Sequence, residues 1–443
     1  NMRIAIIGAG ISGLSTAFYL QQARPDLELL IFDANPEPGG TMHTVERDGF
    51  RFEAGGNGFL TSKPDGLDLV KEAGAEHLLL PSSDLARRRF IFTDRLHRLP
   101  ETPPAFLSSR LLSLPQKMRV AAEVFIPGKR DESDETLQDF GYRRVGKAFT
   151  DVFLDAMTAG IYATTPDRVS VNAAFPLVVR LEREHGGLFR GMIARRKRQA
   201  GPGGILMSFK GGVGRFIEHL QKTLTADWRL DAPVHGIRTD GAGYRVLSSA
   251  GEDRVDQVVV SATAPAGARM LQDLDAELAA RLSAIDYSPI AVVGFGYRHL
   301  DHPLEGFGLL TTTAARLPIL GVLWDSSIFP GRAPAGGKSL RVMLGGQRNP
   351  DLVQQDEDGL VETAREGVRL TMGVTSDPDV VFIKRWENGI PNYPVGHLRA
   401  MEELFKHAAR YPGLHLNCNA YRGIAMNDCI HNSRVLAETI SRP

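Results

Sequence analysis

The sequence predicts an α/β fold that contains a dinucleotide-binding domain. An apolar run at residues 3–7, typical of a strand buried on both faces of a parallel sheet, leads directly into the glycine-rich turn GAGISG. A helix is expected over Leu14–Gln22, and a second apolar strand over Leu27–Phe32 ends at Asp33. Strand, glycines, helix, strand and acid follow the order of a Rossmann-type βαβ unit.

The glycines of this turn have distinct physical roles. Gly8 permits the tight turn, Gly10 lets the backbone approach a pyrophosphate, and Gly13 lets the helix pack closely on the strand. The unpaired N–H groups at the helix start, at the positive end of its dipole, would bind the pyrophosphate. Asp33 lies twenty residues after Gly13, a spacing at which an acidic side chain reaches ribose hydroxyls. These features alone leave FAD and NAD open.

Composition narrows the class of protein. A chain of 443 residues with 43% hydrophobic and 23% charged residues is expected to fold into two or three structural units. Lys plus Arg equals Asp plus Glu at 52 each, so no nucleic-acid partner is expected. Cys418 and Cys429 show no metal-ligand or disulfide spacing, which indicates a reducing compartment and no metal site. We expect no targeting peptide before the strand at Arg3, and no run of about 20 apolar residues suggests a membrane span.

The middle of the chain alternates between helical and β-rich patterns. Residues 81–127 have a helical pattern, which favours helices over a substrate cavity, with a membrane-binding face as the alternative. A second helical pattern covers 131–148. Arg190 and the run 195–198 are expected in a solvated loop, with contact to anionic lipid or substrate carboxylates as the alternative.

Strands follow in two groups. A meander is expected around 232–237, 243–248 and 257–262, which returns the chain to the nucleotide-binding domain. The β-rich stretches between Ile290 and Gly346 predict an antiparallel sheet in a second domain, which would make a wall for a flat ligand.

Several motifs resemble those of a known family. Gly39 and Gly40 in PEPGGTMHT, followed by FEAGGNGF, resemble the second glycine pair and flavin-proximal loop of the FAD-dependent amine oxidase superfamily. Over nearly the whole chain, the sequence is similar to protoporphyrinogen oxidases, the flavoenzymes of haem biosynthesis. The motifs that carry this likeness are RRRFIFTDRLHRLP, DESDETLQDFGYRRVG, AGIYATTPDRVSVNAAFP, FPGRAP, IPNYPVGH and AYRGIAMNDCI.

The resemblance implies a Rossmann-type FAD-binding domain, a mixed-sheet substrate domain and a helical insertion. The predicted boundaries are 1–80, 203–288 and 409–443 for the FAD-binding domain, 81–202 for the helical part and 289–408 for the substrate domain. FAD would be bound non-covalently, because WENGIPNYPVGH has no cysteine for flavin attachment. The implied cofactor contacts are Gly8, Ala9, Gly10, Ile11, Ser12, Gly13, Asp33, Ala34, Gly40, Thr41, Gly55, Gly56, Asn57, Gly58, Val234, Trp386, Asn419, Ile424, Ala425 and Met426.

The resemblance also implies a substrate site. Arg89 would pair with a propionate, a task suited to a guanidinium fork, while Gly160, Leu310, Leu320 and Met343 would lie around the macrocycle. No catalytic residue is expected, since the flavin performs the chemistry, and His397 is not assigned as a base. The chain departs from the family pattern at Gly55-Gly56, Thr164-Thr165 and Cys418-Asn419, which leaves the exact substrate open.

The implied activity is oxidation of protoporphyrinogen IX to protoporphyrin IX by FAD and dioxygen, on CH–CH groups, in a bacterial cytoplasm. The alternatives are coproporphyrinogen III oxidation, which would need more cationic anchors, and an amine oxidase or desaturase of the same superfamily. A non-catalytic flavin-binding protein is a third alternative. A homodimer and a peripheral contact with the inner face of the cell membrane are left open.

Overall fold

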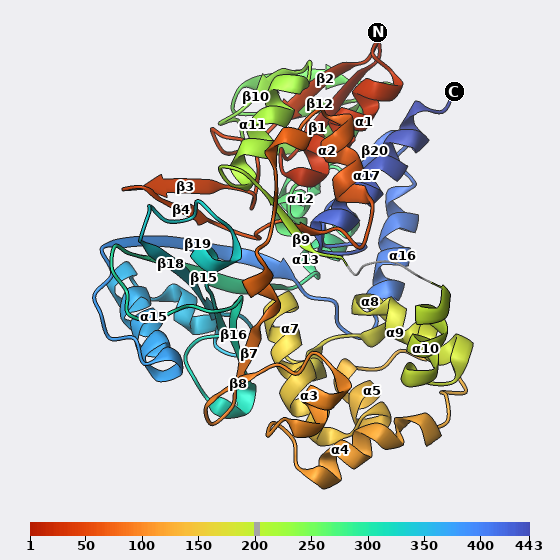
Figure 1. The fold of residues 1–443 in the computed structure, drawn as a ribbon. Coiled ribbons are helices and arrows are strands. Elements are labelled where there is room, and N and C mark those ends of the chain that lie inside the picture. The colour runs from red at the N-terminus through yellow and green to blue at the C-terminus, as the bar shows by residue number, and fades with distance from the viewer. Residues whose placement is uncertain (199–203) are drawn as a thin grey trace.

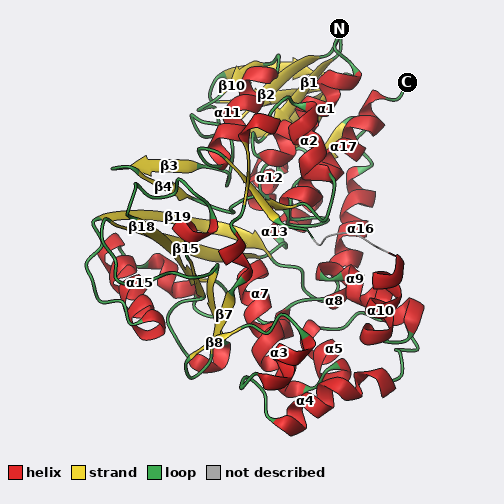
Figure 2. Ribbon diagram, viewed as in Figure 1, coloured by secondary structure: helices red, strands yellow, loops and turns green. Residues whose placement is uncertain are grey.

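The computed structural model describes residues 1–198 and 204–443. Both termini lie in a nucleotide-binding domain at the top of the view, a sheet domain lies at the lower left, and a helical part lies at the lower right (Figures 1 and 2). Three segments far apart in the sequence build the upper domain, as the red, green and blue ribbons of Figure 1 show.

The nucleotide-binding domain is built on a parallel sheet, in which every strand pair is parallel. Its order is β10 (Asp227–Arg229), β2 (Glu28–Phe32), β1 (Arg3–Ile7), β14 (Gln257–Val260) and β20 (Leu414–Leu416). Ile4 and Ile6 pack with the helices of one face, and Ala5 and Ile7 pack with the elements of the other. After Arg3 at its start, the central strand is therefore apolar on both of its sides, as its sequence predicts.

Different elements cover the two faces. On one face lie α1 (Ile11–Ala23), α2 (Asp65–Glu72), α11 (Val213–Thr223) and α17 (Met426–Ser441). On the other face lie β11 (Val234–Asp240), β12 (Gly243–Ser248), β13 (Gly251–Val255), α12 (Ala264–Leu271), α13 (Ala276–Ser283) and α16 (His397–Ala408). Met401 and Leu404 of α16 pack in this cluster, although the sequence assigned 289–408 to the substrate domain.

The expected meander is wrong in its third strand. It consists of β11, β12 and β13, whereas β14 pairs in parallel with β1 and β20. The sequence analysis missed β13 because its GEDRV sequence is polar and largely exposed and lacks an apolar alternation.

The second domain is a seven-stranded mixed sheet. Its order is β19 (Val380–Pro391), β15 (Tyr287–Tyr297), β18 (Lys338–Gly345), β17 (Gly321–Leu323), β16 (Gly308–Thr311), β7 (Arg89–Phe92) and β8 (Leu96–Arg98). Only the β16–β7 pair is parallel. Helix α15 (Glu357–Met372) covers one face of the sheet, through Leu360, Ala364 and Val368. The other face contacts Phe50 and Phe52 of β4 (Phe50–Glu53), which pairs with β3 (Thr44–Arg47).

Residues 89–98 differ from the helical pattern expected over 81–127. They form the β7–β8 hairpin, because RFIF alternates two sides of a sheet and the turn at Thr93–Asp94 is stabilised by a hydrogen bond from Thr93 Oγ1 to Asp94 Oδ1. Phe90 and Phe92 then pack with the α15 side, while Ile91 faces the opposite side.

The remaining insertion is helical. It comprises α3 (Pro103–Ser108), α4 (Leu114–Ala121), α5 (Leu137–Arg144), α6 (Lys147–Phe149), α7 (Asp155–Tyr162), α8 (Val171–Ala174), α9 (Pro176–His185) and α10 (Leu188–Arg198). The segment 195–198 is thus the end of a helix and not the loop we expected. Within the described ranges, no helix is both long and apolar enough to cross a membrane.

Candidate functional site

Two glycines of the turn after β1, Gly8 and Gly13, are packed too tightly for a side chain. A Cβ on Gly13 would lie 1.9 Å from the carbonyl oxygen of Gly8, and a Cβ on Gly8 would lie 2.7 Å from the carbonyl carbon of Ser261. Gly8 also has a φ of +106°, which other residues rarely adopt. Helix α1 therefore starts directly against β1, and its first N–H groups face the end of the sheet, where a pyrophosphate would bind.

The second glycine pair lies against this turn. The Gly39 N–H donates to the carbonyl of Ala9 at 2.7 Å, and Gly10 and Gly39 form a parallel bridge. A Cβ on Gly40 would lie 3.2 Å from the Cα of Gly10. The structure thus brings Gly40 and Thr41 to the predicted pyrophosphate cradle. These contacts fit a dinucleotide, because the two loops meet through glycine backbone and no side chain blocks the approach of a pyrophosphate.

Asp33 closes the cradle at the end of β2. Its Oδ2 accepts from the Ala9 N–H and its Oδ1 from the Asn35 N–H, both at 2.8 Å. A carboxylate has about four acceptor positions, so this geometry leaves capacity for ribose hydroxyls. The Ala232 N–H donates to the Asp33 carbonyl at 2.9 Å, which brings the β11 start, with Val234, beside Asp33 and Ala34.

The loop at Gly55–Gly58 is held from the sheet domain. Arg341 of β18 donates to the carbonyls of Glu53 and Gly55 at 2.8 and 2.7 Å. Trp386 Nε1 of β19 donates to the carbonyl of Ala54 at 2.7 Å. A Cβ on Gly58 would lie 2.0 Å from the Met207 carbonyl oxygen in β9 (Leu206–Phe209), whereas one on Gly56 would meet nothing within 4 Å.

Arg341 is a residue that the sequence analysis missed. It is buried and forms an ion pair with Asp325, the first residue of α14 (Asp325–Ile328), with Nε and Oδ2 2.6 Å apart. A signal was present, because Arg341 is the one charge in the otherwise apolar stretch Leu340–Leu344 of β18. Such a charge is buried only when it is paired.

The C-terminal segment completes the upper part of the site. Tyr393 Oη donates to the carbonyl of Asn419 at 2.6 Å and accepts from the Gly423 N–H at 2.7 Å. Residues 424–426 then lead into α17, which packs along α1, where Ser433 Oγ donates to the carbonyl of Ser12 at 2.9 Å. The predicted contacts Asn419 and Ile424–Met426 therefore follow β20 at the edge of the parallel sheet where β1 enters the glycine turn.

His397 has the geometry of a core histidine. It is 4% exposed, stacks on Tyr393 with ring centroids 4.1 Å apart, and its Nε2 lies 3.0 Å from the Tyr421 carbonyl oxygen. Burial lowers the pKa of the imidazole. Its one polar contact therefore serves to fix the loop that follows β20.

The predicted substrate residues share one face of the mixed sheet. Gly321 of β17 pairs with Leu310 of β16 and with Met343 of β18, so their side chains point to the same side. Leu320 precedes Gly321, packs in one apolar cluster with Met343, and donates its N–H to the Met343 carbonyl at 2.8 Å. Helix α7 lies over this face, since a Cβ on Gly160 would be 3.0 Å from Leu310 Cδ1.

Arg89 lies on the same face, at the start of β7. It pairs in register with Gly308, two residues before the Ile91–Leu310 pair. Its guanidinium carbon lies 4.6 Å from the centroid of the Phe307 ring, and partial burial lowers its pKa. Its neighbour Arg88 forms an exposed pair with Glu305. The five predicted substrate residues therefore line one largely apolar face, with Arg89 at its edge.

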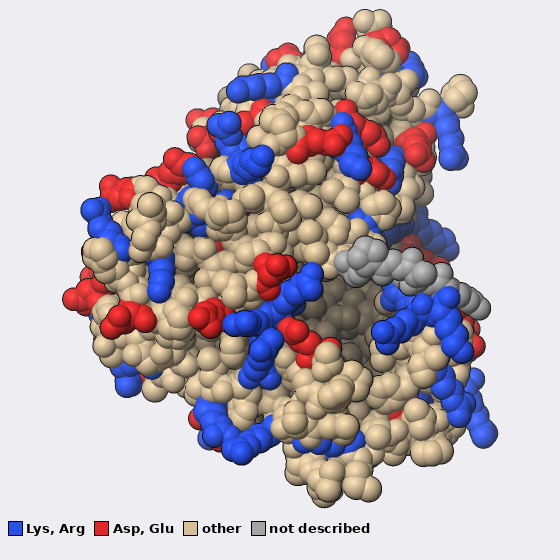
Figure 3. Space-filling view, viewed as in Figure 1, with Lys and Arg blue, Asp and Glu red and all other residues tan. Residues whose placement is uncertain are grey.

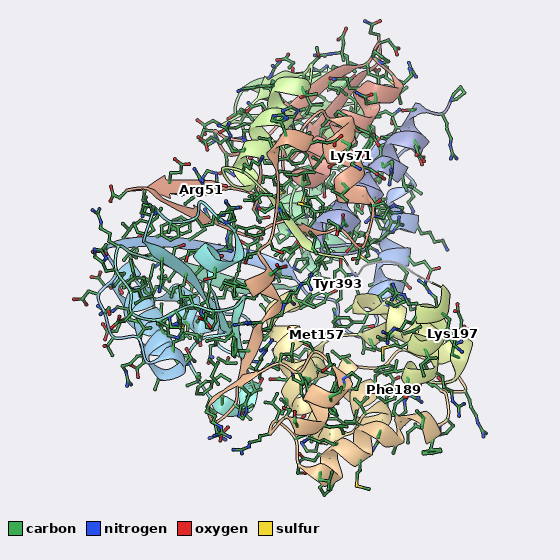
Figure 4. All side chains as sticks on the ribbon, viewed as in Figure 1. Arg51, Lys71, Met157, Phe189, Lys197 and Tyr393 are labelled. Carbon is green, nitrogen blue, oxygen red and sulfur yellow. The ribbon has the colours of Figure 1, made fainter. Side chains whose placement is uncertain are left out.

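A hollow opens in front of this region. Figure 3 shows tan walls inside it and Lys and Arg side chains on both of its sides. Figure 4 shows Met157 of α7 and Tyr393 in the same area, with Lys197 of α10 farther to the right. Gly160 and Ile161 of α7 are exposed although the neighbouring Ala159 and Tyr162 are buried, so one face of α7 is uncovered. No cluster of metal-ligating side chains occurs within 1–198 or 204–443.

Comparison with known proteins identifies the family. Residues 11–440 match the model of the flavin-containing amine oxidoreductases. The chain belongs to this family. As an amine oxidoreductase of the flavin-containing type it uses FAD, and the expected Rossmann-type α/β fold with a mixed-sheet domain is confirmed.

Relatives within the family include porphyrinogen oxidases. The chain is 28% identical to the coproporphyrinogen III oxidase of Bacillus subtilis, over 97% of this chain and 96% of that protein. It is also 28% identical to the chloroplastic protoporphyrinogen oxidase of Oryza sativa, over 98% of this chain and 87% of that protein. A crystal structure from Exiguobacterium sp. 255-15, provisionally assigned as a protoporphyrinogen oxidase, superposes with a TM-score of 0.88 at 26% identity, covering 100% of this chain and 99% of that one.

Proposed function

We propose that this flavin-containing amine oxidoreductase oxidises protoporphyrinogen IX to protoporphyrin IX in haem biosynthesis, with dioxygen as the final electron acceptor. The observation that carries the proposal is the apolar face formed by Leu310, Leu320 and Met343, with Arg89 at its edge. An apolar macrocycle that carries carboxylates, and that becomes flat on oxidation, matches such a wall. The porphyrinogen oxidases among the relatives support the same substrate class.

The chain's own residues would bind and orient the substrate. FAD, held by the glycine turns and the loop at Gly55–Gly58, would supply the two-electron oxidation that is needed three times per macrocycle, with dioxygen as the final acceptor and hydrogen peroxide as its product. Leu310, Leu320, Met343 and Gly160 have no side-chain group that accepts a proton, so we assign them orientation of the macrocycle and exclusion of water. Arg89 would hold a propionate by charge-assisted hydrogen bonds.

The test of this proposal is Arg89→Ala in the FAD-loaded enzyme. Loss of one hydrogen bond to a charged group costs about 1.5–3 kcal/mol, so the KM for protoporphyrinogen should rise about 10- to 150-fold. FAD content should not change, because no described contact joins Arg89 to the glycine turns. Arg88→Ala is the matched control, since Arg88 pairs with the exposed Glu305. An unchanged KM, or loss of FAD, would reject this role.

Coproporphyrinogen III is a second candidate, favoured by the charge around the hollow. Basic residues occur on both of its sides (Figure 3), and α10 carries the exposed side chains of Arg190, Arg195, Arg196 and Lys197. Coproporphyrinogen III carries four carboxylates, which can pair with cations on both sides of the hollow. Protoporphyrinogen IX carries two propionates, which need cations on one side only. Measuring kcat/KM for both porphyrinogens distinguishes the candidates. A joint Arg195→Ala and Lys197→Ala variant should weaken only coproporphyrinogen turnover if this candidate is correct.

We also propose a cytoplasmic location with peripheral membrane contact through the helical insertion. Leu107, Leu114, Met118 and Phe125 are large apolar side chains exposed by 66%, 68%, 64% and 83%. They lie within one segment, which runs from α3 through α4 to the short helical turn Ala122–Phe125. Flotation with vesicles of anionic lipid should recover the wild type, and Phe125→Ser with Met118→Ser should reduce recovery. Equal recovery of both proteins would reject this contact.

A further inference from the structure

A buried ion pair lies beneath the loop that we place next to the flavin. Arg341 is 1% and Asp325 is 3% exposed. Their contact is bidentate, with Nε–Oδ2 and Nη2–Oδ1 distances of 2.6 and 3.2 Å. Burying such a pair rarely stabilises a fold more than apolar side chains of similar volume would. Its position therefore calls for another explanation.

The guanidinium is fully occupied, and most of its donors face one loop. Nη1 donates to the carbonyls of Glu53 and Gly55, at 2.8 and 2.7 Å. Nη2 donates to Asn57 Oδ1 at 2.5 Å, in addition to Asp325. Since arginine has five N–H donors, three serve residues 53–57 and two serve Asp325. A lysine ammonium has three donors and no planar fork, so it cannot reproduce this set.

The same loop is held at a further point by the sheet domain. Trp386 Nε1 of β19 donates to the carbonyl of Ala54, so the carbonyls of three successive residues, 53, 54 and 55, accept from side chains of the mixed sheet. Arg341 also lies two residues before Met343 on β18, and period two places both on one face of the strand. One strand thus carries both the anchor of the loop and part of the proposed substrate wall.

We infer that Arg341, oriented by Asp325, is a positioning residue that fixes the 53–57 loop relative to the substrate wall. The inference rests on the proposed function, because it takes this loop as flavin-proximal and the β18 face as the wall. Flavin and macrocycle belong to different domains, so the distance between them depends on contacts that bridge the domains. Displacing reacting groups by about 1 Å can lower a rate about 100-fold.

The decisive variants change the fork while keeping the protein folded. Arg341→Lys keeps the charge and loses the fork. The double variant Arg341→Met with Asp325→Leu removes both charges, an exchange that protein interiors often tolerate. Arg385→Lys on β19 is the matched control, because Arg385 is exposed and donates to Gln355 instead of the loop. Each purified holoenzyme is compared by visible circular dichroism of the bound flavin, FAD dissociation constant and rate of flavin reduction by porphyrinogen.

We expect both Arg341 variants to unfold at denaturant concentrations near that of the wild type but to show altered flavin dichroism. Anaerobic flavin reduction should slow about 100-fold, while the KM for porphyrinogen changes little. A double variant with wild-type dichroism and rate would overturn the inference, because the pair would then be merely structural. The dichroism and FAD affinity need no porphyrinogen, so they remain informative even if the proposed substrate is wrong.

Discussion

The helical insertion contains a buried ion pair between Glu123 and Arg144, and we predict that Glu123→Gln lowers the free energy of unfolding. Both Glu123 and Arg144 have fully buried side chains. Glu123 Oε1 accepts from Arg144 Nε at 3.0 Å and from the Leu188 N–H at 2.6 Å, and its Oε2 accepts from the Phe189 N–H at 3.2 Å. One carboxylate therefore neutralises a buried guanidinium and caps the start of α10.

The expected loss of stability follows from these contacts. Breaking one side of a buried pair costs about 3–5 kcal/mol. Arg144 retains the carbonyls of Ile126 and Pro127 at 3.1 and 2.9 Å, and Glu182 at 3.3 Å. These partners still compensate the guanidinium, so we expect the lower end, a loss of about 3 kcal/mol in the free energy of unfolding. The new amide also offers N–H groups where four N–H donors already converge, two from Arg144 and one each from Leu188 and Phe189.

Guanidinium chloride unfolding at pH 7, followed by circular dichroism, measures this loss. Glu184→Gln is the control, because Glu184 is exposed and should change stability by less than about 0.5 kcal/mol. Since Glu123 holds the start of α10, we also expect faster tryptic cleavage after the exposed residues at 195–197. If Glu123→Gln unfolds like the control, the pair does not hold this helix and the reasoning fails.

Three further predictions concern cofactor, substrate and acid stability. Gly13→Ala places a Cβ 1.9 Å from the Gly8 carbonyl oxygen, so the purified protein should lose its FAD absorbance. Gly160→Ala places a methyl group 3.0 Å from Leu310 Cδ1 on the proposed substrate wall, so steady-state assays should show a higher KM with normal FAD content. The pKa of Asp275 is lowered to about 2: burial opposes the shift, but the Leu278 N–H, Tyr411 and His407 outweigh it. This carboxylate therefore stabilises the fold above its unfolded pKa, and the contribution is lost as pH falls from about 4 to about 2. When denaturation is measured at pH 5 and pH 3, the free energy of unfolding should fall less for Asp275→Asn than for the wild type.

Local sequence patterns predicted the nucleotide-binding unit well. The strand at 3–7 and the strand ending at Phe32 match β1 and, within one residue, β2, because all residues after the first of each strand are apolar and buried. The sequence also singled out Gly39 and Gly40 as a second glycine pair, and the structure places this pair against the first turn, with a backbone bridge between Gly10 and Gly39. The glycines of these two turns are required by close backbone approach, so their spacing in the sequence predicts the structure directly.

Elements whose form depends on distant partners were harder to predict. The sequence of the β7–β8 hairpin resembles the proline-rich helical region around it. Arg89–Phe92 forms a strand because β16, more than 200 residues later in the chain, pairs with it in parallel. Strand β13 is polar because its far side is open to solvent. Arg341 was overlooked because its partners, Asp325 and the loop at 53–57, are brought to it only by the fold. Local patterns carry no information about such long-range contacts.

The parallel sheet of the nucleotide-binding domain has a consequence for how the chain is made. Its strands come from residues 3–32, 227–260 and 414–416, and α17, at 426–441, covers α1. During translation, β1 and β2 leave the ribosome hundreds of residues before β20 and α17, so one face of α1 stays uncovered for about 20 s or longer at typical elongation rates. The nascent chain would then need a chaperone or a transient substitute contact for that apolar face, and FAD capture would follow synthesis of α17 rather than of the glycine turn.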